Sequence, residues 1–321
     1  MNTLAAILAV LGAAVVVVPV AASRAEHPAN GGGLDLGVMS FNIRYGSASD
    51  GDNRWELRRD LVAEVLRRHR PDVAGLQEAL AWQLDELLAV LPHYATVGVG
   101  RDDGRRGGEF APILFDTRRF RVDQQGTFWL SDTPELPGSK SWGNTLPRIC
   151  TWVRLIEVPS RRGVYVYNVH LDHASRPSRE CSAVLLAQRI AARTHRDPVL
   201  LTGDLNAGEE SRTVGLLTGA AALPPAPGTG PAFVPLVDTF RALHPDATGV
   251  GTYHGFAGRT DGEKIDYVFA PASAEVRAAA IVHDAPQGRY PSDHFPVIAR
   301  LCLMTTGRPM PSPSEHRAPA R

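Results

Sequence analysis

Short apolar runs of five to eight residues recur between residues 36 and 301, and stretches with helical periodicity separate several of them. Runs of this length, rich in β-branched and aliphatic residues, predict β-strands, whereas apolar residues three or four positions apart predict helices. Strands in pairs with interspersed helices predict an α/β fold in which two packed β-sheets are flanked by helices. We expect strands at 36–43, 72–77, 94–99, 110–115, 151–158, 164–170, 199–205, 265–270, 276–282 and 297–301, and helices at 54–68, 81–91 and 185–193.

Polar side chains stand where several of these runs end. Asp204 closes an apolar run, and Asp293 with His294 precedes the last run. Carboxylates and imidazoles at strand-to-loop junctions can converge on a phosphate and a hard metal ion. Asn42, Glu78, His170 and Asp266 stand at comparable junctions, and together these residues predict a metal-dependent phosphoesterase.

Six short motifs resemble those of the endonuclease/exonuclease/phosphatase superfamily, in the order that the family has. They span residues 36–301 and are Phe41-Asn42-Ile43-Arg44, Gln77-Glu78, Asn168-Val169-His170-Leu171, Gly203-Asp204-Leu205-Asn206, Ile265-Asp266-Tyr267 and Ser292-Asp293-His294-Phe295. The resemblance implies a four-layered α/β sandwich with the active site where loops of the two sheets meet, and a Mg²⁺ or Mn²⁺ ion. Further runs, among them Gly98 to Gly104 and Gly108-Glu109-Phe110, are similar to a bacterial, often exported subgroup and to the deadenylase-like branch.

The oxygen donors of the motifs are candidates for the metal site. Mg²⁺ keeps several waters and takes one or two carboxylates from the protein, so Glu78 and Asp293 are the expected ligands. Asn42 can add an amide oxygen or orient Glu78.

The remaining motif residues are candidates for catalysis. Asp204 is expected to orient or deprotonate the attacking water, and Asn206, on the same side of an extended segment, to donate to a phosphate oxygen. His294 is expected to contact the phosphate or hold the nucleophile, with Asp266 fixing its tautomer. His170 is a second imidazole for the phosphate.

Substrate contacts are expected from charged residues near the motifs, namely Arg44, Glu109, Arg148 and Arg179. Lys plus Arg and Asp plus Glu both number 34, so nothing in the overall charge favours a polyanionic partner. The predicted activity is hydrolysis of a phosphoric diester or monoester. A monomer is expected, and the sequence implies no protein partner. The alternatives are an exported nuclease acting on DNA or RNA, a sphingomyelinase-like lipid phosphodiesterase, and an inactive binding module.

The chain ends carry signals of their own. Residues 4–22 are apolar without a charged side chain, and small residues follow, which predicts a cleaved export signal over residues 1–22 or, alternatively, a membrane anchor with an extracytoplasmic domain. We expect a spacer at 23–35, the catalytic domain at 36–303, a loop at 219–235 and a disordered tail at 304–321. Cys150 and Cys181 could form a disulfide in an exported protein, or all three cysteines could be free thiols.

Overall fold

Alternate side chains of β1 (Gly33–Asn42) enter two different hydrophobic cores. The structure, a computed structural model, describes residues 33–224 and 232–304. Leu34, Leu36 and Val38 face one core, whereas Met39 and Phe41 face another. Successive side chains of a strand point to opposite faces, so β1 lies in a sheet covered on both sides.

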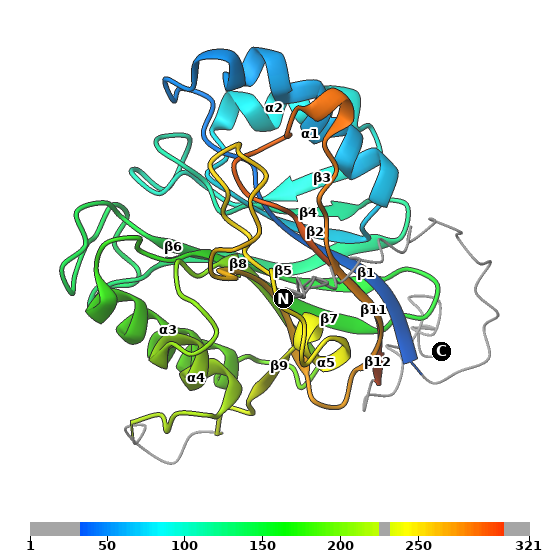
Figure 1. The fold of residues 1–321 in the computed structure, drawn as a ribbon. Coiled ribbons are helices and arrows are strands. Elements are labelled where there is room, and N and C mark those ends of the chain that lie inside the picture. The colour runs from blue at the N-terminus through cyan, green and yellow to red at the C-terminus, as the bar shows by residue number, and fades with distance from the viewer. Residues whose placement is uncertain (1–32, 225–231, 305–321) are drawn as a thin grey trace, which may run out of the picture.

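The first sheet has six strands in the order β11-β12-β1-β2-β4-β3. Its strands are β1, β2 (Val73–Gln77), β3 (Tyr94–Val97), β4 (Ile113–Asp116), β11 (Glu275–Ile281) and β12 (Val297–Met304). β1 and β2 run parallel, and the other neighbours are antiparallel. Helices α1 (Trp55–His69) and α2 (Ala81–Val90) cover the outer face, at the top of Figure 1.

The second sheet also has six strands, in the order β5-β6-β7-β8-β10-β9. Its strands are β5 (Phe120–Trp129), β6 (Ile149–Glu157), β7 (Gly163–His170), β8 (Val199–Asp204), β9 (Leu236–Asp238) and β10 (Asp266–Pro271). β7 and β8 run parallel. Helices α3 (Arg176–Ala191) and α4 (Arg212–Thr218) cover its outer face, and the short α5 (Thr239–Leu243) packs against β10 and β11. Two 3₁₀ turns, Gly51–Asn53 and Pro286–Gly288, lie in loops.

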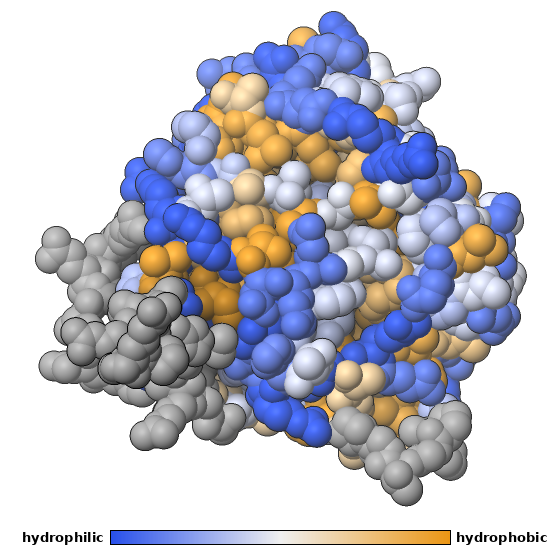
Figure 2. All heavy atoms as spheres, turned by 180° about the vertical axis from the view of Figure 1, so that it is seen from behind, coloured by the Kyte–Doolittle hydropathy of each residue, from blue (hydrophilic) through white to orange (hydrophobic). Residues whose placement is uncertain are grey.

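The core between the sheets takes aliphatic residues from both. Val38 of β1, Val153 and Leu155 of β6 and Val166 of β7 are buried there. Truncating one of the larger of these side chains to alanine would cost about 2–5 kcal/mol through the cavity left behind. The expected four-layered sandwich of two sheets flanked by helices is confirmed. Seen from behind in Figure 2, hydrophilic residues are interspersed with smaller apolar areas on the surface.

Some elements differ from their predicted extents. The helix expected at 185–193 begins at Arg176, because the side chain of Ser175 caps it by accepting a hydrogen bond from the Ser178 backbone N–H at 3.2 Å. β5 was not predicted, since it is an edge strand whose middle residues are polar and exposed. The short elements α4, β9 and α5 were also missed.

The chain ends are only partly covered by the structure. β1 begins at Gly33, within the predicted spacer, and β12 ends at Met304. The predicted export signal at 1–22 and the rest of the predicted tail lie outside the described residues. Across 33–224 and 232–304 we find no helix of the length and apolar character needed to cross a membrane. Cys150, Cys181 and Cys302 are free thiols, so the possible disulfide is not formed.

Candidate active site

The ends of four strands and the start of a fifth bring the predicted site residues together at one end of the sandwich. Asn42 is the last residue of β1, and Glu78 directly follows the parallel β2. His170 and Asp204 end the parallel strands β7 and β8 and pair in register. Asp266 begins β10 opposite Asp204. Because parallel strands finish at the same edge of a sheet, each sheet gathers its polar residues at one edge. The hydrogen bond between Asn42 and Asp204 shows that the two edges lie side by side.

The side chain of Asn42 connects the two sheets. Its Nδ2 donates to Oδ2 of Asp204 at 3.0 Å and to Oε1 of Glu78 at 3.1 Å, and it lies 3.5 Å from Nε2 of His294. Its Oδ1 accepts the backbone N–H of Arg44 at 3.0 Å. In this arrangement the amide orients two carboxylates while its oxygen is already engaged. Of the two roles expected for Asn42, the geometry suits the orientation of Glu78 better than direct metal ligation.

Glu78 and Asp293 face a common positive charge. The guanidinium of Arg44 lies 3.8 Å from Oε2 of Glu78 and 3.8 Å from Oδ2 of Asp293, and it also pairs with Asp50. Burial opposes the charge on Arg44, but these three carboxylates raise its pKa above the ordinary value. Glu78 has a φ of 60°, a backbone conformation that is unfavourable for a residue with a side chain and that often occurs at functional sites. Two buried carboxylates beside a cation form a donor set that fits Mg²⁺ or Mn²⁺.

His294 and Asp266 form a buried pair. Nδ1 of His294 lies 2.8 Å from Oδ2 of Asp266, and its Nε2 lies 3.8 Å from Oδ2 of Asp204. Burial would lower the pKa of His294, but Asp266 and Asp204 outweigh burial and raise the pKa well above its usual value. Burial and the neighbouring Asp266 raise the pKa of Asp204. The two carboxylates therefore favour the charged form of the imidazole, and its Nε2 is directed toward Asp204.

The same cluster could also hold a cation. Ligand atoms of Asp204, Asp266 and His294 all lie within 4.8 Å of one another. Oδ1 of Asp266 is buried and has no hydrogen-bond partner in the described part of the chain. This donor set differs from the predicted pair of carboxylates, Glu78 and Asp293, and it would bind a divalent ion only with His294 in its neutral form.

His170 lies between the carboxylates of Asp204 and Glu109, at 3.7 Å from each. Burial lowers the pKa of His170 well below its usual value, and Arg148 and Arg101 add to this effect. Arg101 holds Glu109 through two contacts of 2.7 and 2.8 Å. His170 is therefore a neutral imidazole with one N–H available. Sequence analysis missed Arg101 as a site residue. It lies in the glycine-rich run Gly98 to Gly104, where a charged side chain is usually exposed, so the sequence did not indicate its buried pairing with Glu109.

Arg148, expected in the substrate pocket, is also buried at this end of the molecule. Its Nη2 lies 3.0 Å from Nδ1 of His173, and its Nε lies 3.5 Å from Oδ2 of Asp172. Its Nη1 is buried and lacks a hydrogen-bond partner among the residues described. Burial and the like charge of Arg101 lower the pKa of Arg148.

Two other predicted residues lie differently than expected. The chain is not extended at Asn206, whose φ is 47°; its backbone N–H donates to Asp204 and its Nδ2 donates to the carbonyl oxygen of Leu171 at 3.0 Å. The extended geometry that would place Asn206 beside Asp204 is therefore wrong, because this residue turns the chain. Arg179 on α3 donates to the carbonyl oxygens of Asp172 and His173 and so braces the loop after His170.

Arg58 is a buried residue that sequence reasoning missed. Its guanidinium donates to the carbonyl oxygens of Ile43, Arg44 and Pro291, and its Nε donates to that of Asn53 at 2.9 Å. Burial lowers the pKa of Arg58 to about 10. The contacts connect the loop after Asn42 to the loop before Asp293. A signal was present in the sequence, since Arg58 lies four positions before Val62 on the buried face of α1.

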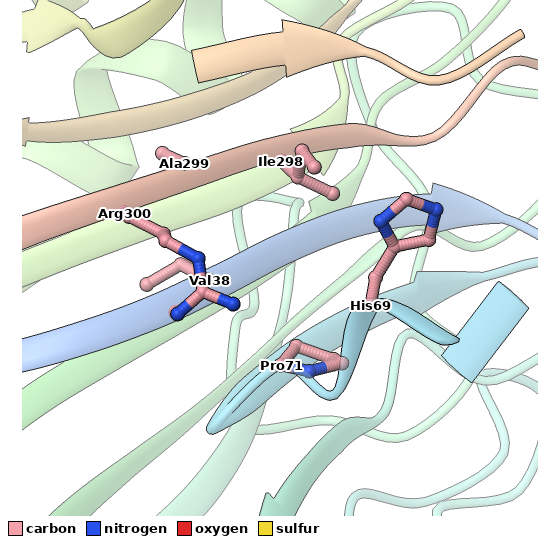
Figure 3. Close-up of a pocket in the computed structure, with 7 residues that line it drawn as sticks. Val38, His69, Pro71, Ile298, Ala299 and Arg300 are labelled. Carbon is pink, nitrogen blue, oxygen red and sulfur yellow. The ribbon is translucent and has the colours of Figure 1, made fainter. Parts of the chain in front are cut away.

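A small pocket elsewhere contains none of these residues. It measures about 20 Å³ and lies where β1 and β12 meet the end of α1, lined by His69, Pro71 and Arg300 among others (Figure 3). This volume holds about one water molecule.

The structure is a sandwich of two sheets with carboxylates, histidines and an asparagine at the strand ends. This is the architecture that the six sequence motifs predict, and it is that of a class of phosphoesterases. The sequence profile of the Endonuclease/Exonuclease/phosphatase family matches residues 39–294, and the chain belongs to this family.

Solved structures agree with this assignment. An endonuclease/exonuclease/phosphatase from Bacteroides vulgatus is 32% identical, with a TM-score of 0.75 over 84% of this chain and 99% of that one. A mannosyl-6-phosphatase from Bacteroides thetaiotaomicron is 30% identical, with a TM-score of 0.73 over 83% and 99% of the two chains. The human Nocturnin catalytic domain, at 18% identity and a TM-score of 0.66 over 84% and 94%, shares the fold.

Proposed function

We propose that this chain is a divalent-metal-dependent phosphomonoesterase that hydrolyses a small sugar phosphate by attack of an activated water. The observation that carries the proposal is the hydrogen-bonded cluster in which Asn42 connects Glu78 of the first sheet to Asp204 of the second, beside the His294–Asp266 pair. The proposal is supported by the proximity of Asp204, the proposed base, to His294, the proposed charged donor, and to Glu78 of the proposed metal-binding pair.

The residues of the chain have separate roles in this mechanism. Asp204 orients the water and accepts its proton, a task favoured by the raised pKa of its buried carboxyl. His294, kept charged by Asp266, donates through Nε2 to a phosphoryl oxygen and stabilises the charge that develops there. Neutral His170, whose Nε2 lies 3.7 Å from Oδ2 of Asp204, offers a further N–H. When bound at Glu78 and Asp293, a divalent cation would neutralise phosphoryl charge and help the alkoxide leave.

Two observations favour a small sugar monoester over the alternatives. The mannosyl-6-phosphatase from B. thetaiotaomicron is 30% identical to this chain and covers 83% of it. The formal charge of the chain is zero, whereas affinity for a polyanion rests on many neutralised phosphates. A nuclease or lipid diesterase remains the alternative that a substrate comparison must exclude.

The test compares initial rates on hexose 6-phosphates, bis(p-nitrophenyl) phosphate, a short RNA and sphingomyelin vesicles, each with Mg²⁺, with Mn²⁺ or with EDTA. We expect the highest kcat/KM on a hexose 6-phosphate, its loss in EDTA and its return with either metal. Asp204→Asn should lower kcat by on the order of 10²-fold or more, whereas Asp246→Asn, at an exposed acid, should leave it unchanged. Higher kcat/KM on RNA or a diester, or full activity in EDTA, would overturn the proposal.

We further propose that the enzyme is exported. The support is the uncharged apolar segment at residues 4–22 followed by small residues, which has the character of a signal peptide. The free thiols do not argue otherwise, because an oxidising compartment permits disulfides without requiring them.

A further inference from the structure

An exposed aromatic ring stands beside the buried catalytic histidine. Of the phenylalanines, tryptophans and tyrosines that the structure describes, only Tyr253 and Trp82 are exposed, at 54% and 39%. The ring of Tyr253 lies 5.1 Å from the ring of His294, centre to centre, at an interplanar angle of 60°. His294 itself is 4% exposed. The Tyr253 ring therefore borders the site from the solvent side and contributes little to the core.

The backbone on either side of Tyr253 is hydrogen-bonded to the segment that carries Asp293 and His294. Tyr253 pairs with His294 in an isolated β-bridge, in the loop between α5 and β10 (yellow to gold in Figure 1). The N–H of Phe295 donates to the carbonyl oxygen of Thr252 at 2.8 Å, and the N–H of His254 donates to that of Asp293 at 2.8 Å.

The neighbours of Tyr253 point the other way. The hydroxyl of Thr252 accepts the backbone N–H groups of Ile265 and Asp266 at 2.9 and 3.1 Å. His254 is buried against the ring of Phe295 at 3.9 Å. Side chains alternate along an extended segment, so burying these two turns Tyr253 outward. Its ring is thus exposed on a backbone that cannot readily move away from His294.

We propose that Tyr253 forms a stacking platform for the sugar ring of the leaving group, and so determines specificity for cyclic over acyclic phosphoesters. The inference rests on the proposed phosphomonoesterase function. In a hexose 6-phosphate the ring begins two bonds from the ester oxygen. When His294 donates to the phosphoryl group, the sugar ring therefore lies next to His294, where Tyr253 presents its exposed ring. The apolar C–H face of a sugar packs on an aromatic ring, whereas a short polyol has no such face.

The experiment measures KM and kcat of the metal-loaded full chain for mannose 6-phosphate and for glycerol 2-phosphate, an alkyl monoester without a ring. Tyr253→Ala removes the ring, and Tyr253→Phe keeps the ring and removes the hydroxyl. Trp82→Ala, at the other exposed aromatic residue, is the matched control. We expect Tyr253→Ala to raise KM for mannose 6-phosphate roughly 3- to 10-fold with little change in kcat, and to leave KM for glycerol 2-phosphate unaltered.

Tyr253→Phe should keep the wild-type KM for both substrates. Equal effects of Tyr253→Ala on the two substrates, or no effect on either, would overturn the inference. A raised KM for mannose 6-phosphate in Tyr253→Phe would also overturn it, because the hydroxyl and not the ring would then bind the sugar. A readout independent of turnover is calorimetric binding of mannose 6-phosphate to Asp204→Asn with and without Tyr253→Ala; unchanged affinity would also overturn it. Failure of the proposed function is distinguishable, because the wild-type enzyme would then hydrolyse neither monoester.

Discussion

Asp266→Asn should leave the shape of the site intact while removing the charge that holds His294 protonated. The two side chains have nearly the same size, and Oδ2 of Asp266 lies 2.8 Å from Nδ1 of His294 in a fully buried position. A hydrogen bond between charged groups contributes about 1.5–3 kcal/mol. If that stabilisation is felt in the transition state, kcat should fall roughly 10- to 150-fold.

The loss should depend on pH. Asp266 is the strongest influence raising the pKa of His294, so its neutral replacement lowers that pKa. His294 donates to phosphate only when its Nε2 carries a proton, and the charged form is lost as pH rises through the pKa. The variant should therefore lose activity at a lower pH than the wild type, and the ratio of the two kcat values should grow from mildly acidic to mildly alkaline conditions.

The assay is a kcat profile against pH for both proteins on the same monoester, with circular dichroism to confirm the fold. Asp261→Asn, at an exposed acid in the loop before β10, is the control and should match the wild type. A wild-type profile for Asp266→Asn would refute the role of the pair. A large rise in the Mg²⁺ concentration needed for half-maximal rate would instead assign Asp266 to the metal.

Three further predictions concern the scaffold, the chain start and the substrate. Arg58→Met should lower the free energy of unfolding by roughly 3 kcal/mol in urea titration, because four backbone carbonyl groups lose a buried donor. Arg68→Met, at an exposed residue of the same helix, should not lower it, and equal stabilities of the two variants would contradict the account. N-terminal sequencing of the protein from its native host should find a mature chain beginning near Ser23 or Glu26; a membrane-bound product that retains Met1 would favour the anchor. KM for a hexose 6-phosphate should change little with salt, whereas a steep rise of KM with salt on duplex DNA, together with poor monoester turnover, would point to a local basic patch and a nuclease.

Most of the strands and the polar residues at their ends could be predicted from the sequence alone. Asn42, His170 and Asp204 each close an apolar run, and strand periodicity is a local property that neighbouring residues determine. The edge strand β5 could not be predicted in this way, because its residues Arg121 to Gln125 are largely exposed and mostly polar, as in a loop. Its strand conformation depends on pairing with β6, which begins twenty residues later.

Only the tertiary structure decided which polar residues contact one another and which are buried. Asn42 and Asp204 are 162 positions apart, so their hydrogen bond exists only because the two sheets pack face to face. The same packing buries Arg101 against Glu109 and Arg58 against two loops, and it leaves Tyr253 exposed beside His294. The sequence by itself determined which chemical groups stand at the strand ends. Their partners, burial and protonation followed from packing, because a side chain's pKa and hydrogen bonds depend on what lies near it in space.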